Sequence, residues 1–146
     1  MFQNVTESLA IGNIVSPEEL KEIYQKGYQT IIDLCTISEG NQLNAESVKQ
    51  LGFEFVSLPI DRLNLSPATL EGFMQAVNAA PKPIYTRCAS GLRAGVMTLL
   101  TLAVEQDWTE QHYLDRRQVL GLEHKPNCPL EAYAHQYFES QKTSKV

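Results

Sequence analysis

Residues 83–97 read PIYTRCASGLRAGVM, and this stretch decides which fold we expect. Residues 84–87 favour an extended chain and end directly at Cys88. Small residues follow, and Arg93 then lies at the start of an apolar run that is typical of a buried helix over residues 92–104. Cys88 is therefore expected at the carboxyl end of a strand, which is where ligands bind in parallel α/β sheets.

Strand-forming and helix-forming segments alternate on both sides of this stretch. Aromatic, aliphatic and β-branched residues predict further strands at 9–12, 30–34 and 53–58. Capping residues, Ser-Pro starts and apolar spacing predict helices at 16–27, 44–52, 66–80, 92–104, 109–121 and 127–138. The alternation predicts an α/β fold with a central, mainly parallel sheet flanked by helices. We expect one domain over residues 1–140, followed by a frayed tail at 141–146.

The chain has 146 residues and a formal net charge of −5, which limits the classes of partner. The negative charge argues against nucleic acid and anionic membranes. The start MFQNVTESLA lacks the basic and apolar regions of a signal peptide, and the apolar run at 94–104 is too short to cross a membrane. The three cysteines have no disulfide-framework spacing. Together these features predict a cytoplasmic protein, and they leave the oligomeric state open.

The loop after Cys88 has the residue types of an anion-binding cradle. Small residues allow backbone N–H groups to converge, and the following helix aims its positive N-terminus at the same point. This field favours a thiolate over a thiol, and the planar guanidinium of Arg93 can grip two oxygens of a tetrahedral anion. We expect a Cys88 nucleophile in a cradle formed by Ala89, Ser90, Gly91 and Leu92. Because the loop supplies the positive charge, we expect no metal and no cofactor.

Several segments occur in an order and spacing that resemble a known family. They are VTESLAIG (5–12), SPEELKEIYQKGYQTIIDL (16–34), SEGNQ (38–42), LGFEFVSLPID (51–61), LSPATLEGFMQAV (65–77) and RCASGLRAG (87–95). Over roughly residues 5–122 the chain resembles the bacterial beta-lactamase-hydrolase-like, or phosphatase-like, family, which is related to the dual-specificity protein tyrosine phosphatases.

The resemblance implies a phosphatase fold and a cysteine-dependent hydrolysis of phosphate monoesters, with phosphotyrosine among the candidates. Cys88 would take the phosphoryl group as a phosphocysteine, and Arg93 would bind it with the loop amides. Asp61 lies 27 residues before Cys88, where these phosphatases carry a general acid. The substrate would be an anionic small molecule or a phosphoprotein, and Arg87 would help to bind it.

Three positions depart from the tyrosine phosphatase pattern. Arg93 follows the cysteine by five residues rather than six, Arg87 replaces a histidine, and Ala94 replaces a hydroxyl residue. Ser90 is a candidate to supply the missing hydroxyl. The shorter loop also resembles that of rhodanese-type sulfurtransferases, in which Cys88 would carry a persulfide and Asp61 would have no role. A third alternative is a phospho-ligand binding module without turnover.

Cys35 ends the strand predicted at 30–34 and is a candidate redox partner of Cys88. If the strands that precede the two cysteines are neighbours in the sheet, both sulfurs end at the same level. In some relatives of the resembled family, a cysteine at that strand end traps the oxidised nucleophile as a disulfide. The alternative is a buried cysteine that only fills space.

Overall fold

The computed structural model describes residues 1–122 and 128–144, without the side chains of residues 143 and 144. Its centre is a five-stranded sheet in the order β1-β2-β5-β3-β4. The strands are β1 (Phe2–Asn4), β2 (Leu9–Gly12), β3 (Thr30–Asp33), β4 (Glu54–Ser57) and β5 (Ile84–Arg87). β1 pairs antiparallel to β2, and all the other pairs are parallel. The predicted α/β fold with a mainly parallel sheet is confirmed.

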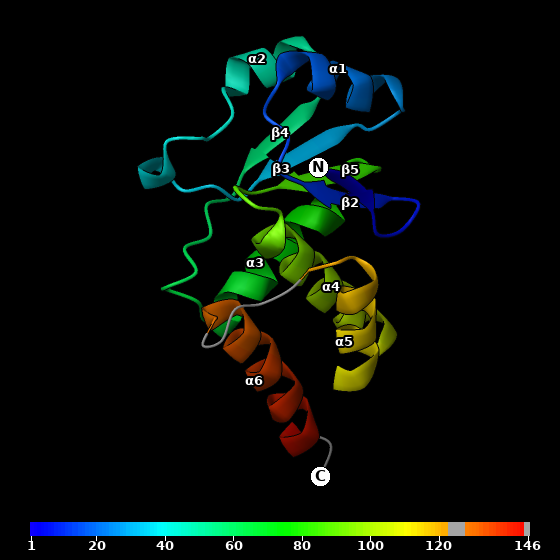
Figure 1. Cartoon of the computed structure of the whole chain (residues 1–146), viewed down its shortest axis with the longest axis vertical. Coiled ribbons are helices and arrows are strands. Elements are labelled where there is room, and N and C mark those ends of the chain that lie inside the picture. Colours follow the sequence, from blue (N-terminus) through cyan, green and yellow to red (C-terminus); the bar gives the residue numbers. More distant parts are fainter. Residues whose placement is uncertain (123–127, 145–146) are drawn as a thin grey trace.

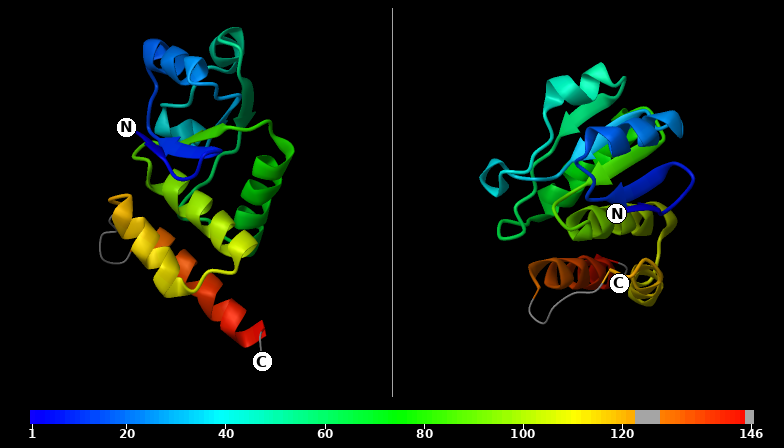
Figure 2. Two further views of the ribbon diagram at one scale, coloured as in Figure 1. Left: turned by 90° about the vertical axis from the view of Figure 1, so that its right-hand side faces the viewer. Right: turned by 45° about the horizontal axis from the view of Figure 1, so that its top comes forward.

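Helices cover both faces of the sheet (Figures 1 and 2). One face carries α1 (Pro17–Gln25) and α2 (Ala45–Gln50). The other face carries α3 (Pro67–Ala79) and α4 (Leu92–Gln106), and α5 (Glu110–Val119) and α6 (Pro129–Ser144) lie outside α4. A short 3-10 helix, η1 (Ile37–Glu39), follows β3. The cysteine loop therefore enters the most deeply buried helix of the fold.

Alternation along β5 distributes its side chains between two apolar cores. Ile84 and Cys88 belong to the core on the α4 side, whereas Tyr85 belongs to the core under α1 and α2. Successive residues of a strand point to opposite faces, so Arg87 shares the face of Tyr85 and not that of Cys88. This alternation therefore places the side chains of Arg87 and Cys88 on opposite faces of the sheet.

The observed elements differ from the expected ones at both ends of the chain. The edge strand β1 was not predicted, because its sequence FQN has no apolar alternation and its pairing with β2 is a tertiary contact. α6 continues to Ser144 rather than ending near Phe138, so the segment expected to fray is helical as far as it is described. Asn127, the expected cap of this helix, lies outside the described residues. Within residues 1–122 and 128–144, no helix combines the length and the apolar character that a membrane span needs.

Candidate active site

The Cys88 sulfur lies at the N-terminus of α4. It accepts hydrogen bonds from the backbone N–H groups of Gly91, at 3.1 Å, and Ala94, at 3.4 Å. Gly91 has a φ of 89°, in the left-handed region that glycine adopts without strain, and this turn brings its N–H back onto the sulfur. The start of the helix thus aims two amide dipoles at a single sulfur, an arrangement that favours negative charge on it.

The outer part of the cysteine loop faces a cleft of about 440 Å³. Ala89 and Ser90 line this cleft and are exposed, and their N–H groups donate to no other residue in the part of the chain that the structure describes. The Ser90 hydroxyl accepts from the N–H of Leu92 at 3.3 Å, within the turn that precedes α4, and it makes no hydrogen bond to the sulfur in the described structure. Cys88 itself has no exposed surface and lies beneath the loop.

Arg93 joins three loops at the carboxyl edge of the sheet. Its Nη1 donates to the Ile60 carbonyl at 2.8 Å and, more weakly, to the Leu34 carbonyl at 3.4 Å. Its Nη1 and Nη2 both bond the carboxylate of Glu39, at 2.7 and 2.6 Å. The guanidinium is therefore held at the cleft by the segments that follow β3 and β4.

The Arg93–Glu39 pair holds both groups in their charged forms. The bond from Arg93 lowers the pKa of Glu39 to about 2. Burial acts to lower the pKa of Arg93, but the bond to Glu39 and the nearby Cys88 outweigh it, and the net shift is upward. Because the folded-state pKa of Glu39 is depressed, its stabilising contribution is present above the ordinary value of 4.5 and is lost only as the pH falls toward 2. The pair is thus intact at neutral pH.

Asp61 is brought to the same cleft as Arg93 and Ser90. It directly follows Ile60, whose carbonyl holds Arg93. Its carboxylate accepts from the Leu63 N–H at 2.9 Å and from the Asn64 side chain at 2.8 Å. These bonds form a turn of the Asx type within the loop 58–66, and the carboxylate remains exposed.

Arg87 does not line the cleft, although the sequence suggested it as a substrate-binding residue. Its side chain is fully buried, and Nη1 donates to Asp33 at 2.9 Å and to the Asn41 carbonyl at 2.9 Å. Asp33 in turn accepts from the N–H groups of Cys35 and Leu43. The pair braces the loop after β3 from the far face of the sheet.

Cys35 and Cys88 follow neighbouring strands, as the sequence suggested. β3 and β5 pair in parallel, and the N–H of Leu34 bonds the carbonyl of Arg87 at 2.9 Å. Both cysteines are free and have no exposed surface. Burial raises the pKa of the Cys35 thiol to about 11, so this thiol is neutral at neutral pH.

We expect peroxide to join Cys35 and Cys88, slowly at neutral pH. Oxidation of Cys88 by peroxide would give a sulfenic acid, and attack by the Cys35 thiolate would form the disulfide and release hydroxide. The thiolate fraction rises about tenfold per pH unit below its pKa, so bridging should accelerate by that factor from pH 7 to 8. Mass spectrometry of the tryptic peptides measures the bridge. A Cys35→Ser variant should lack it, and an absence of the bridged peptide at both pH values in the unsubstituted protein would contradict the expectation.

One group of possible metal ligands occurs within the described residues. Glu110, His135 and Glu139 present ligand atoms within 4.8 Å of one another, on α5 and α6 and away from the cysteine loop. Glu110 and His135 already bond each other at 2.8 Å, and the side chains of His135 and Glu139 are 58% and 51% exposed. We interpret the group as a surface ion-pair network between two helices.

Sequence reasoning missed two features of the cleft. Nothing in the sequence pairs Glu39 with Arg93, which lies 54 residues away. Leu130, in the first turn of α6, also lines the cleft. Its role depends on how α6 folds back across α4, which is a tertiary contact with no local signal.

Comparisons with known proteins agree with this geometry. Residues 1–105 match the family model described as beta-lactamase hydrolase-like protein, phosphatase-like domain. No curated protein matches the chain in sequence.

Three solved structures share the fold at low sequence identity. A DUF442 protein from Shewanella putrefaciens CN-32 is 20% identical, with a TM-score of 0.74 over 92% of this chain and 89% of that chain. TpbA from P. aeruginosa is 16% identical, with a TM-score of 0.79 over 92% of this chain and 83% of that chain. Tk-PTP in its active form is 16% identical, with a TM-score of 0.79 over 95% of this chain and 96% of that chain. The resemblance read from the motifs is confirmed, and the chain belongs to the phosphatase-like domain family of the beta-lactamase hydrolase-like proteins.

Proposed function

We propose that this protein hydrolyses phosphate monoesters through a phosphocysteine on Cys88. The observation that carries the proposal is the convergence of the Gly91 and Ala94 amides on the Cys88 sulfur, with the guanidinium of Arg93 held beside the same loop. Amide dipoles and a guanidinium aimed at one point stabilise both a thiolate and the oxygens of a transferring phosphoryl group.

In the first step the Cys88 thiolate attacks phosphorus, so that a sulfur–phosphorus bond forms and the ester phosphorus–oxygen bond breaks. The oxygens of the phosphoryl group bind Arg93 and the unpaired amides of Ala89 and Ser90. Asp61, once released from its turn with Asn64, gives its proton to the leaving alkoxide or phenoxide.

In the second step Asp61 takes a proton from a water molecule, and the resulting hydroxide attacks the phosphocysteine. The sulfur–phosphorus bond breaks, the thiolate returns to the amides at the start of α4, and inorganic phosphate leaves. The proton that Asp61 donated in the first step is replaced in the second, so the cycle consumes only ester and water.

The test is a comparison of substrates at a single protein concentration. P. aeruginosa TpbA, which is 16% identical with a TM-score of 0.76, has been solved in complex with phosphotyrosine. We therefore choose a phosphotyrosine peptide as the first substrate and compare it with p-nitrophenyl phosphate and an alkyl phosphate. We expect release of inorganic phosphate from the aryl esters. Thiocyanate formation from thiosulfate and cyanide would instead favour the sulfurtransferase, to which the five-residue spacing from Cys88 to Arg93 points. Saturable phosphate binding without any turnover would favour a binding module.

Asp61→Asn should lower kcat about 100-fold, and by more for substrates with a poor leaving group. A general acid matters most when the departing oxygen is basic, so phenyl phosphate should suffer more than p-nitrophenyl phosphate. Steady-state kinetics with both esters measure the difference. Asn64→Ala, which opens the same turn but keeps the carboxylate, is the matched control. An equal loss with both esters, or no loss, would remove Asp61 from the mechanism.

Glu39→Gln should lower kcat/KM about tenfold by loosening Arg93 rather than by touching the substrate. The carboxylate bonds both Nη atoms of Arg93, and a neutral amide cannot accept both bonds. A guanidinium that is no longer held in place must lose conformational freedom when the phosphoryl group binds. Glu39→Asp should recover part of the loss, and Glu22→Gln on the exposed face of α1 controls for net charge. An unchanged kcat/KM for Glu39→Gln would show that Arg93 needs no such support.

A further inference from the structure

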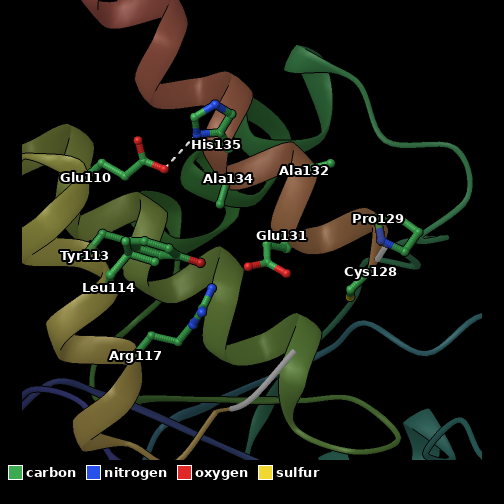
Figure 3. A pocket seen from close by; sticks show the side chains of 10 residues that line it. All are labelled: Glu110, Tyr113, Leu114, Arg117, Cys128, Pro129, Glu131, Ala132, Ala134 and His135. Carbon is green, nitrogen blue, oxygen red and sulfur yellow. Dashed lines mark hydrogen bonds and ion pairs between the residues drawn. The ribbon is translucent and has the colours of Figure 1, made fainter. Parts of the chain in front are cut away.

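A second hollow lies between α5 and α6, away from the cysteine loop. Its volume is about 550 Å³, and Figure 3 shows side chains of both helices around it. The lining combines aliphatic surface with a small number of polar and charged groups. Neither the proposed hydrolysis nor the family assignment accounts for these polar groups.

The Tyr113 hydroxyl is the first of these unexplained groups. The residue is 1% exposed, and no group within the described part of the chain meets full hydrogen-bond geometry with its hydroxyl, although Arg117 approaches it closely enough to lower its pKa. In Figure 3 the hydroxyl points into the hollow. Burial raises the pKa of Tyr113 to about 12, more than the nearby Arg117 lowers it, so the hydroxyl keeps its proton and can donate. A buried hydroxyl without a full partner is unfavourable, so a ligand that accepts its hydrogen bond would be favoured.

Arg117 is the second group. Its guanidinium carbon lies 5.9 Å from the centre of the Tyr113 ring, and its Nη1 is buried without a hydrogen-bond partner among the described residues. Figure 3 shows the guanidinium and the Tyr113 hydroxyl directed toward the same space. Two convergent donors, one of them cationic, are suited to a carboxylate or another anionic acceptor.

Glu131 is the third group, and it argues against a simple anion. Its carboxylate lines the same hollow from α6 and faces Arg117 and Tyr113 in Figure 3. No ion pair between Arg117 and Glu131 occurs in the described structure. The other acid at this hollow, Glu110, is already bonded to His135 at 2.8 Å. One cation and one carboxylate thus face a shared space without neutralising each other.

We propose that this hollow binds a small zwitterion of the amino-acid type. The ligand carboxylate would accept from Arg117 and Tyr113, and its ammonium group would donate to Glu131. Leu114, Pro129, Ala132 and Ala134 supply the apolar lining for its side chain. A ligand with only a negative charge would meet Glu131 uncompensated, and one with only a positive charge would meet Arg117 in the same way.

The experiment uses the whole protein and four amino acids with different side chains: L-leucine, L-serine, L-glutamate and L-lysine. Amide chemical shifts of α5 and α6 are followed by NMR during titration to about 10 mM, ten times a millimolar dissociation constant. We expect saturable shifts confined to these helices with at least one amino acid. Two analogues of leucine that each lack one charge, 4-methylpentanoate and 3-methylbutylamine, should bind at least about tenfold more weakly.

Three variants test the named groups. Arg117→Met should weaken binding about tenfold or more, and Tyr113→Phe, which removes only the hydroxyl, should weaken it roughly two- to tenfold. Glu131→Gln should reduce the preference for the zwitterion over 4-methylpentanoate. Lys21→Met and Glu22→Gln, on exposed positions of α1, control for net charge.

Several outcomes would overturn the proposal. It is overturned if none of the four amino acids gives saturable shifts, if either singly charged analogue binds as well as leucine, or if Arg117→Met leaves the affinity unchanged. None of these results depends on whether Cys88 turns over a phosphate ester. The proposed hydrolysis and the proposed zwitterion site are therefore tested independently of each other.

Discussion

Cys88→Ser is expected to lower the turnover of p-nitrophenyl phosphate by about 10⁴-fold or more. A hydroxyl at this position is not ionised at neutral pH, so the amides at the start of α4 have no anion to stabilise and the phosphoryl group has no strong nucleophile. The serine oxygen can still accept from the Gly91 and Ala94 amides that now bond the sulfur, so the loop should keep its shape. Stopped-time phosphate assays, with circular dichroism to verify the fold, measure the effect.

The chain offers a matched control for this loss. Cys128 is a free cysteine directly before α6, half-buried and outside the cleft at the cysteine loop, and Cys128→Ser should leave kcat unchanged. Binding of inorganic phosphate should survive in Cys88→Ser, because Arg93 and the amides of Ala89 and Ser90 remain. Retained turnover in Cys88→Ser would end the phosphocysteine mechanism, and equal losses in both serine variants would point to oxidation or misfolding rather than chemistry.

Local chemistry in the sequence was enough to predict most elements of the fold. The Ser16–Pro17 pair caps α1, with the Ser16 hydroxyl accepting from the N–H of Glu19, and Asn44 caps α2 in the same way. The cysteine loop was predictable because strand, small residues and apolar helix follow one another within fifteen residues of sequence. Each of these signals depends on neighbours along the chain, so no tertiary knowledge was needed.

The remaining features depend on contacts between distant segments. Glu39 reaches Arg93 only because β3 and β5 are neighbours, so that the loops after both strands meet at one edge. The pairing of β1 with β2 and the place of Leu130 in the cleft have the same origin. Polar loop residues such as Glu39 carry no local pattern that distinguishes a partner of the Arg93 guanidinium from a solvated side chain.

Arg87 is different, because the sequence did contain the information needed to place it. A strand alternates its side chains, so two successive residues at its end cannot both face the same ligand. If Cys88 shares the face of Ile84, then Arg87 must share the face of Tyr85. The interpretation of Arg87 as a substrate-binding residue placed it in the strand but did not apply this alternation, and β5 is indeed paired with its neighbours at this residue.

Arg87→Met should therefore destabilise the fold by about 3–5 kcal/mol. Any loss of substrate binding should be explained by the lower stability and not by a lost contact with the substrate. Both Arg87 and Asp33 have side chains that are 1% exposed, so loss of the guanidinium leaves a carboxylate buried without its countercharge. The Asn41 carbonyl loses its donor at the same time, which loosens the loop that carries Glu39. The loss should appear as a fall of roughly 10 °C in Tm and as a lower urea midpoint.

A double-mutant cycle separates this effect from a role in binding. Asp33→Asn alone should also destabilise, and combining it with Arg87→Met should cost less than the sum of the two, since no isolated charge remains buried. Arg62→Met, an exposed cation on the cleft, is the matched control: it should raise KM for phosphate esters and leave Tm unchanged. If Arg87→Met instead raises KM at an unchanged Tm, the buried pair is not structural and Arg87 reaches the substrate after all.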